Sequence, residues 1–140
     1  RTIQMGIMTE LSSNPAKVSK SSEELFVYLT NLERFHDSLP EQVTHYRVEG
    51  DTCSFTIQGM ADLTLKITQK EPFRKVVFSN AHDKPFPFRL IFDIEAGSSE
   101  QECKVVVSFA GELNPMLAML AKGPLQNFVE LVATRLSSLS

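Results

Sequence analysis

Tryptophan is absent from this sequence of 140 residues, and cysteine and tyrosine occur only twice each. Two cysteines are too few for a disulfide framework. Cys53 and Cys103 also show neither a CxxC pattern nor a Cys/His spacing that would suit zinc. We therefore expect two half-buried free thiols, and we expect neither a bound metal nor a cofactor.

Long apolar runs and a strong excess of charge are missing as well. The sequence contains no stretch of about 18 consecutive apolar residues, and residues 1–25 lack the apolar run with basic flanks of a secretory signal. These absences predict a cytoplasmic protein without stable membrane insertion. The net charge is −3 and the basic residues are scattered, whereas binding to a phosphate backbone needs clustered Lys and Arg. Nucleic acid is therefore not an expected partner.

The composition that is present suits a single globular domain spanning residues 1–140. Hydrophobic residues make up 42% of the chain and charged residues 22%, which are ordinary values for a folded protein. A chain of this length buries roughly two thirds of the surface that its unfolded form exposes.

The first half of the chain begins with a broken strand and two short helices. A weak alternation of apolar and polar residues predicts a first strand within residues 4–20, interrupted near Asn14-Pro15. Ser21 and Glu24 have the spacing of a capping box, which predicts the start of a helix. Asn31 is suited to cap a second short helix that ends before Pro40.

After Pro40 the pattern alternates with the period of a strand over about seventy residues. Turn signals divide it at Glu49-Gly50-Asp51, Gly59, Glu71-Pro72, Asp83-Lys84-Pro85 and Gly97-Ser98-Ser99. Connections this short join antiparallel strands. The result is a meander of six strands with one apolar face, whose members are Cys53, Phe55 and Ile57; Leu63, Leu65 and Ile67; Val76 and Phe78; Phe88, Leu90, Phe92 and Ile94; and Val105, Val107 and Phe109.

A long amphipathic helix is predicted from about Asn114 to Leu139, and it is the element available to cover the apolar face. Pro124 lies inside it and cannot donate to the carbonyl of Leu120, so we expect a kink or a short break there. A twisted sheet closing around one helix is expected to leave unfilled space, because the helix contributes Ala118 and Ala121 rather than bulk.

This order of elements resembles the START-like superfamily, also called SRPBCC or helix-grip, which includes pollen allergens, polyketide cyclases and lipid-transfer domains. The segments at 22–29 and 31–35 are similar to the first helix pair of small bacterial members, and those at 113–116 and 124–128 to the start of their last helix. The resemblance implies an α+β helix-grip fold. In that fold a seven-stranded curved antiparallel sheet wraps around a long C-terminal helix, with two short helices between strands 1 and 2.

The resemblance also implies a cavity for lipids, sterols, polyketides or similar compounds. The glycine-rich loop of the allergen-like members is reduced here to Glu49-Gly50-Asp51, and the paired acid and base groups of the cyclase-like members have no obvious counterpart. We therefore expect non-catalytic binding or carriage of a small hydrophobic ligand by a monomer or weak homodimer. The alternatives are a polyketide cyclase/dehydratase-like enzyme and an interaction module with a filled core. The residues expected to line the cavity are Phe55, Leu63, Leu65, Phe78, Leu90, Phe92, Val107, Leu117, Leu120 and Phe128.

Candidate catalytic groups are few, and we assign none. Arg89 points outward by strict alternation, although a bulge could turn it toward a ligand carboxylate. Glu112 is expected at a solvated strand end, and His36, His45 and His82 at the surface, without a partner at a catalytic spacing.

Met119 is placed on the polar side of a straight helix, away from Phe128. We expect first that a kink at Pro124 rotates it inward, and second that it flanks the cavity entrance. A dimer patch is the third interpretation.

Overall fold

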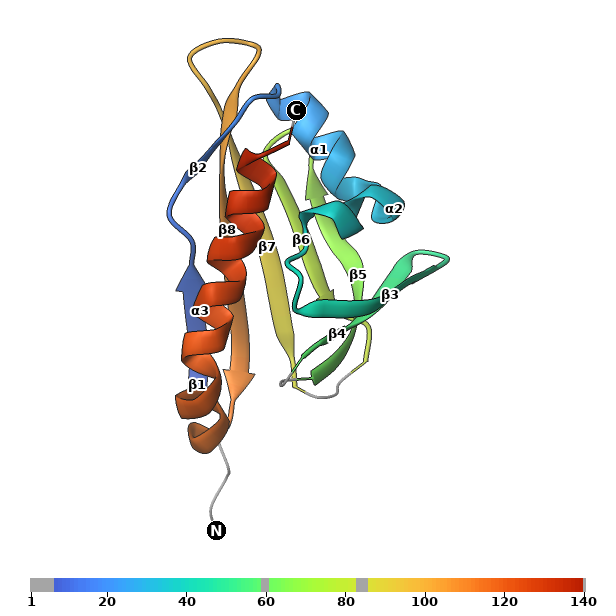
Figure 1. Cartoon of the computed structure of the whole chain (residues 1–140), viewed down its shortest axis with the longest axis vertical. Coiled ribbons are helices and arrows are strands. Elements are labelled where there is room, and N and C mark those ends of the chain that lie inside the picture. The colour runs from blue at the N-terminus through green and yellow to red at the C-terminus, as the bar shows by residue number, and fades with distance from the viewer. Residues whose placement is uncertain (1–6, 59–60, 83–85, 140) are drawn as a thin grey trace.

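The computed structural model describes residues 7–58, 61–82 and 86–139, and it shows one antiparallel sheet with helices on its inner face (Figure 1). The turns expected at Gly59 and at Asp83-Lys84-Pro85 lie outside these residues. The strands are β1 (Ile7–Ser12), β2 (Ala16–Val18), β3 (Val43–Glu49), β4 (Thr52–Ile57), β5 (Ala61–Glu71), β6 (Lys75–Asn80), β7 (Phe88–Ala96) and β8 (Cys103–Leu113). The helices are α1 (Ser22–Thr30), α2 (Leu32–Phe35), the 3-10 helix η1 (His36–Ser38) and α3 (Pro115–Ser137).

The strand order is β1-β8-β7-β6-β5-β4-β3, with β2 also paired to β8. β1 and β2 are two pieces of one interrupted strand along β8, so the predicted arrangement of seven strand positions is confirmed. At the interruption the Ser13 hydroxyl accepts a hydrogen bond from the Val107 amide at 3.0 Å, while the Ser13 amide donates to the Val107 carbonyl at 2.8 Å. The Ser13 side chain thus continues the hydrogen bonding to β8 at the point where Asn14-Pro15 interrupts the strand.

The helix starts follow the capping signals in the sequence. The Ser21 hydroxyl accepts from the Glu24 amide at 3.1 Å, and the Glu24 carboxylate accepts from the Ser21 amide at 2.9 Å, which confirms the capping box. Asn31 caps α2, as predicted. Asn114 caps α3 by accepting from the Leu117 amide at 2.8 Å, and Pro115 occupies the first turn of that helix.

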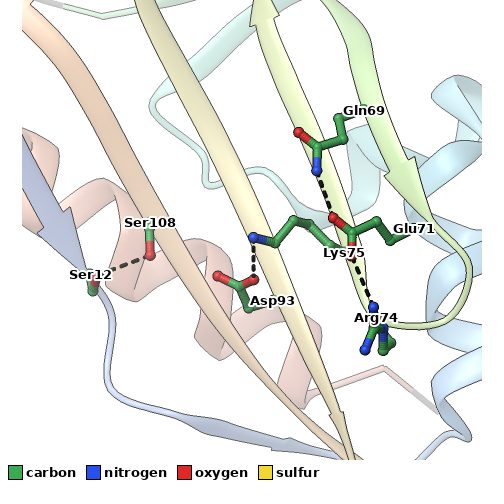
Figure 2. Close-up of polar contacts among 7 residues, drawn as sticks. All are labelled: Ser12, Gln69, Glu71, Arg74, Lys75, Asp93 and Ser108. Carbon is green, nitrogen blue, oxygen red and sulfur yellow. Dashed lines mark hydrogen bonds and ion pairs between the residues drawn. The ribbon is translucent and has the colours of Figure 1, made fainter.

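The two faces of the sheet differ in polarity, as the alternation predicts. The buried side chains Phe55, Leu65, Phe92 and Val107 face the helices. Figure 2 shows the opposite face, where Ser12 and Ser108 on neighbouring strands share a hydrogen bond of 2.9 Å and Lys75 pairs with Asp93 at 3.4 Å. Gln69 and Arg74 both donate to the carboxylate of Glu71 on the same face. The outer face is therefore held by polar contacts, and the core lies on the inner face.

The helices cover the inner face unevenly. α3 packs against β8, β1 and β2, whereas α1 packs against β6 and β7 (Figure 1). The buried side chains of α3 begin at Ala121 and continue to Leu136. Residues 115–120 at the start of the helix are exposed or half-buried, and Leu117 and Ala118 among them pack against the edge of the core.

The helix α3 runs without interruption from Pro115 to Ser137. Of the kink or short break expected at Gly123-Pro124, the break is wrong, because the loss of one amide donor removes a single hydrogen bond and the turns on both sides continue the ladder. Met119 is 81% exposed, so its expected rotation toward the interior is also wrong. Among the described residues, no helix is both long and apolar enough to cross a bilayer.

Phenylalanine rings fill most of the space between sheet and helices. Phe35, on the short helix α2, stacks on Phe78 with ring centres 4.5 Å apart and meets the edge of Phe92 at 5.8 Å. A second cluster joins Phe88 to Phe109 at 5.6 Å and to Phe86 at 5.6 Å. Both clusters are buried, so the interior is packed rather than hollow.

Replacing Phe35 with alanine should remove the centre of the first cluster. Because Phe35 is fully buried, we expect the free energy of unfolding to fall by about 3–5 kcal/mol. Urea denaturation followed by circular dichroism measures this change. Val27→Ala is the control, since Val27 is 52% exposed on α1 and its loss should change stability by about 0.5 kcal/mol or less. Equal effects of the two changes would contradict the packed interior.

Candidate functional site

A hollow of about 300 Å³ opens between the first half of α3 and the end of β4, and we call it the mouth. Its volume lies at the lower end of the range for ligand pockets, which is roughly 300–1,000 Å³. The described residues that line it are Gln42, Ile57, Gln58, Leu117, Leu120, Ala121, Pro124, Asn127 and Phe128. The mouth exists because α3 lies toward β8 and leaves the end of β4 uncovered.

A much smaller internal cavity, of about 20 Å³, lies behind the mouth. That volume suits about one water molecule. All the described residues that line the cavity are apolar, namely Phe55, Ile57, Leu63, Leu65, Phe86, Phe88, Leu90, Phe109, Leu125 and Phe128. The expectation of spare volume is therefore met only at the rim, because the phenylalanine side chains occupy the interior.

Ile57 and Phe128 line both the mouth and the internal cavity. Ile57 is the last residue of β4, and Phe128 lies on the buried side of α3. These two side chains form the boundary between the two spaces, so movement of either would connect the mouth with the apolar interior.

The mouth continues along α3 into a second hollow of about 640 Å³. Gln42 and Gln58 line both hollows, and their backbones are joined by a hydrogen bond of 2.9 Å from the Gln58 amide to the Gln42 carbonyl. The second hollow also has Glu41 and Arg135 in its lining, so it carries charged groups that the mouth lacks.

The residues predicted to line a cavity fall into three groups. Phe55, Leu63, Leu65, Leu90 and Phe128 line the internal cavity. Leu117 and Leu120 lie at the mouth, together with Phe128. The remaining three, Phe78, Phe92 and Val107, are buried in the packed core. A ligand-binding role for any of them stays a prediction.

Several residues around these spaces were missed by the sequence analysis. Ile57, Phe88 and Phe109 belong to the same alternating apolar faces as the predicted residues, so that signal could have included them. The amide side chains of the mouth carried no such signal. Gln42 and Asn127 are 85 positions apart in the sequence (127 − 42), and only the tertiary fold brings them to one hollow.

The ionisable residues considered as candidates in the sequence lie at the surface. Arg89, Glu112, His36, His45 and His82 are all exposed, as predicted. Among the described residues that line the mouth or the internal cavity, none carries an ionisable or hydroxyl side chain. The described part of the chain also contains no group of three or more His, Cys, Asp or Glu residues that could hold a metal ion.

A cluster of aromatic and polar side chains surrounds Tyr46, which is a half-buried residue of β3. Tyr46 donates a hydrogen bond of 2.7 Å to the Leu32 carbonyl, and its ring stacks between His36 at 4.6 Å and Phe55 at 6.0 Å. Burial raises the pKa of the Tyr46 phenol far above its ordinary value, and the adjacent Cys53 thiol adds to the rise. Burial likewise raises the pKa of Cys53. The Tyr46 hydroxyl is engaged with the Leu32 carbonyl, and neither Tyr46 nor Cys53 lines the mouth or the internal cavity, so this cluster ties β3 to α2.

Both cysteines are free and fully buried, which is deeper than the half-buried position expected. Burial also raises the pKa of Cys103. Since the thiolate is the reactive form, neither cysteine is suited to act as a nucleophile.

Tyr28 is the second tyrosine, and its hydroxyl is buried without a hydrogen-bond partner among the described residues. Burial raises its pKa to about 12, and the negative charge of Asp37 contributes to the rise. The Arg34 guanidinium lies 5.0 Å from the centre of the ring. Tyr28 lines neither the mouth nor the internal cavity, so it belongs to the packing of α1 against the core.

Solved structures of other proteins share this architecture. XoxI from Bacillus cereus is 12% identical, with a TM-score of 0.71 over 93% of this chain and 92% of its own. Norcoclaurine synthase from Thalictrum flavum, in complex with dopamine and hydroxybenzaldehyde, is 11% identical, with a TM-score of 0.68 over 97% of this chain and 91% of its own. A protein from Thermus thermophilus is 16% identical, with a TM-score of 0.69 over 92% of this chain and 94% of its own.

These likenesses, together with the observed topology, show that the chain has the START-like helix-grip fold, as the sequence predicted. No protein-family model and no curated protein sequence matches it. The fold places the mouth between the last helix and the sheet, where the resemblance implied a binding site.

The two tyrosines should resist ionisation in the folded chain. Both phenols have raised pKa values in the folded state, Tyr28 near 12, so the folded form retains protons that the unfolded form loses above about pH 10. The stability contributed by the neutral phenols is complete below pH 10 and is lost as the pH rises toward 12. Because the chain has two tyrosines and lacks tryptophan, near-ultraviolet absorbance of phenolate reports them directly. We expect phenolate to appear together with loss of near-ultraviolet circular dichroism, and ionisation near pH 10 in the folded protein would contradict the burial.

Proposed function

We propose that this chain binds a small hydrophobic molecule at the mouth and does so without catalysing a reaction. The observation that carries the proposal is the continuity between the mouth and the apolar interior through Ile57 and Phe128. A ligand seated at the mouth contacts Leu117, Leu120 and Phe128, and its apolar end points toward the cavity.

The interior can enlarge to admit part of a ligand. Its lining consists of Phe, Leu and Ile side chains, which can exchange contacts with one another for contacts with an apolar guest without leaving a polar group unpaired. Displacement of Phe128 alone would join about 20 Å³ of interior space to about 300 Å³ at the rim. The proposal therefore requires a change in side-chain position and no change of fold.

The composition of the lining favours binding over catalysis. General acid-base chemistry needs at least one group that takes up or releases a proton at the reacting atom. The described lining offers amides and apolar groups. Norcoclaurine synthase shows that an enzyme can have this fold, but a fold of this kind hosts many functions, and the site decides between them.

Two neighbouring positions on α3 provide a matched test. Leu120 lines the mouth and is 68% exposed, whereas Met119 is 81% exposed and is not part of the lining. Leu120→Glu should weaken binding of an environment-sensitive apolar dye by about tenfold or more, because it places a charge beside the apolar guest. Met119→Glu should leave dye affinity within about twofold of the wild type. Fluorescence titration measures both.

Since both side chains are largely exposed, neither change should disturb folding, and circular dichroism checks this. Equal affinity in the two variants would show that the dye binds elsewhere. Failure of the unmodified chain to bind any apolar dye, and to carry a ligand in native mass spectrometry, would contradict the proposed function itself.

A further inference from the structure

The polar groups of the mouth are all uncharged carboxamides. Gln42, Gln58 and Asn127 line it, and the other described lining residues are apolar. Each carboxamide supplies two N–H donors and one oxygen acceptor. The mouth can therefore hydrogen-bond to a ligand as donor or acceptor, but it cannot neutralise a charge.

These three carboxamides are available to a ligand. Their side chains make no hydrogen bond to another residue within the described parts of the chain. The backbone bond between Gln42 and Gln58 fixes both glutamines on one side of the mouth, while Asn127 projects from α3 next to Phe128. Polar groups thus lie on both sides of the opening. Gln58 follows Ile57 in the sequence and Asn127 precedes Phe128, so both are next to the apolar boundary.

We infer that the ligand of this site is a neutral amphiphile, with a hydroxyl or carbonyl group at the carboxamides and an apolar body toward Ile57 and Phe128. The inference rests on the proposed function and names the chemical class of its ligand. An ionised group at this position would lose part of its hydration without gaining an opposite charge, which is unfavourable for a carboxylate and for an ammonium alike. A neutral polar group replaces its hydrogen bonds to water with hydrogen bonds to the amides.

The charged groups of the adjoining hollow do not alter this selection. Glu41 and Arg135 line the adjoining hollow and carry opposite charges. The Arg135 side chain already donates from Nε to the Asp37 carbonyl at 3.3 Å. Arg135 lines the second hollow and lines neither the mouth nor the internal cavity, so a carboxylate bound to it would lie outside the proposed site.

Competition between ligands of equal chain length tests the inference. Decanol, decanoate and decylamine are each used to displace a bound apolar dye from the full chain at neutral pH, below the concentrations at which they self-associate. We expect decanol to displace the dye at about tenfold lower concentration than either charged ligand, which corresponds to about 1.4 kcal/mol. If decanoate or decylamine displaces the dye at the same concentration as decanol, the inference is overturned, although the proposed function would stand.

Substitutions at Asn127 test whether the carboxamides of the mouth cause the preference for a neutral ligand. Asn127→Leu should raise the decanol concentration needed for displacement several-fold after correction for the dye affinity measured in the same variant, and Asn127→Lys should shift the preference toward decanoate. Gln101→Lys adds the same charge at an exposed loop position outside the mouth and should leave the preference unchanged.

Two outcomes would contradict the inference. In the first, decanoate displaces the dye from the unmodified chain at a lower concentration than decanol does, and this difference disappears in Arg135→Gln. The charged hollow would then select the ligand, and the inference would be wrong. If the dye itself fails to bind, the proposed function fails and this inference falls with it.

Discussion

The inner face of the sheet is apolar along its whole width, and the chain has too few helical residues to cover it evenly. This constraint determines where the site can be. α3 covers β8, β1 and β2, and α1 covers β6 and β7, so the end of β4 is left open beside the first half of α3. Leu117 and Leu120, in the half of α3 that extends beyond the buried stretch, complete the hollow from the other side.

The same constraint explains why the interior is packed. Phe35 comes from a helix of only four residues, yet it reaches the centre of the inner face and stacks on Phe78. Phe86, Phe88 and Phe109 form a second group of rings, from β7, β8 and the residues before β7, and they line the internal cavity. Large rings compensate for the small number of covering helices, since each buries more apolar area than an aliphatic side chain. Stability of the free chain and space for a ligand therefore depend on the same side chains, and Phe128 stands where the two meet.

The local features of the fold could be predicted from the sequence because they depend on neighbouring residues. The capping box at Ser21, the cap at Asn114 and the alternation from Phe88 to Ile94 each involve a few consecutive positions. The filled interior could not be predicted, since it depends on how far Phe35 reaches across the sheet. The mouth could not be predicted either, because an amphipathic stripe shows which side of α3 is buried but not which strands it covers. The break expected at Pro124 was wrong because the missing amide donor of one proline leaves the rest of the helical hydrogen bonds intact.

A bulge in β3 keeps ionisable groups away from the interior. Val43 faces inward opposite Ile57, so strict alternation would place His45 and Arg47 inward as well. The register shifts between Thr44 and Arg47, where His45 takes a φ of 58°, and Tyr46 faces inward instead, against Phe55. A histidine and an arginine are thereby exchanged for a phenol held neutral by burial. The bulge therefore keeps the side chains of His45 and Arg47 out of the interior. The apolar lining of the internal cavity and the uncharged lining of the mouth likewise offer no group for acid-base chemistry.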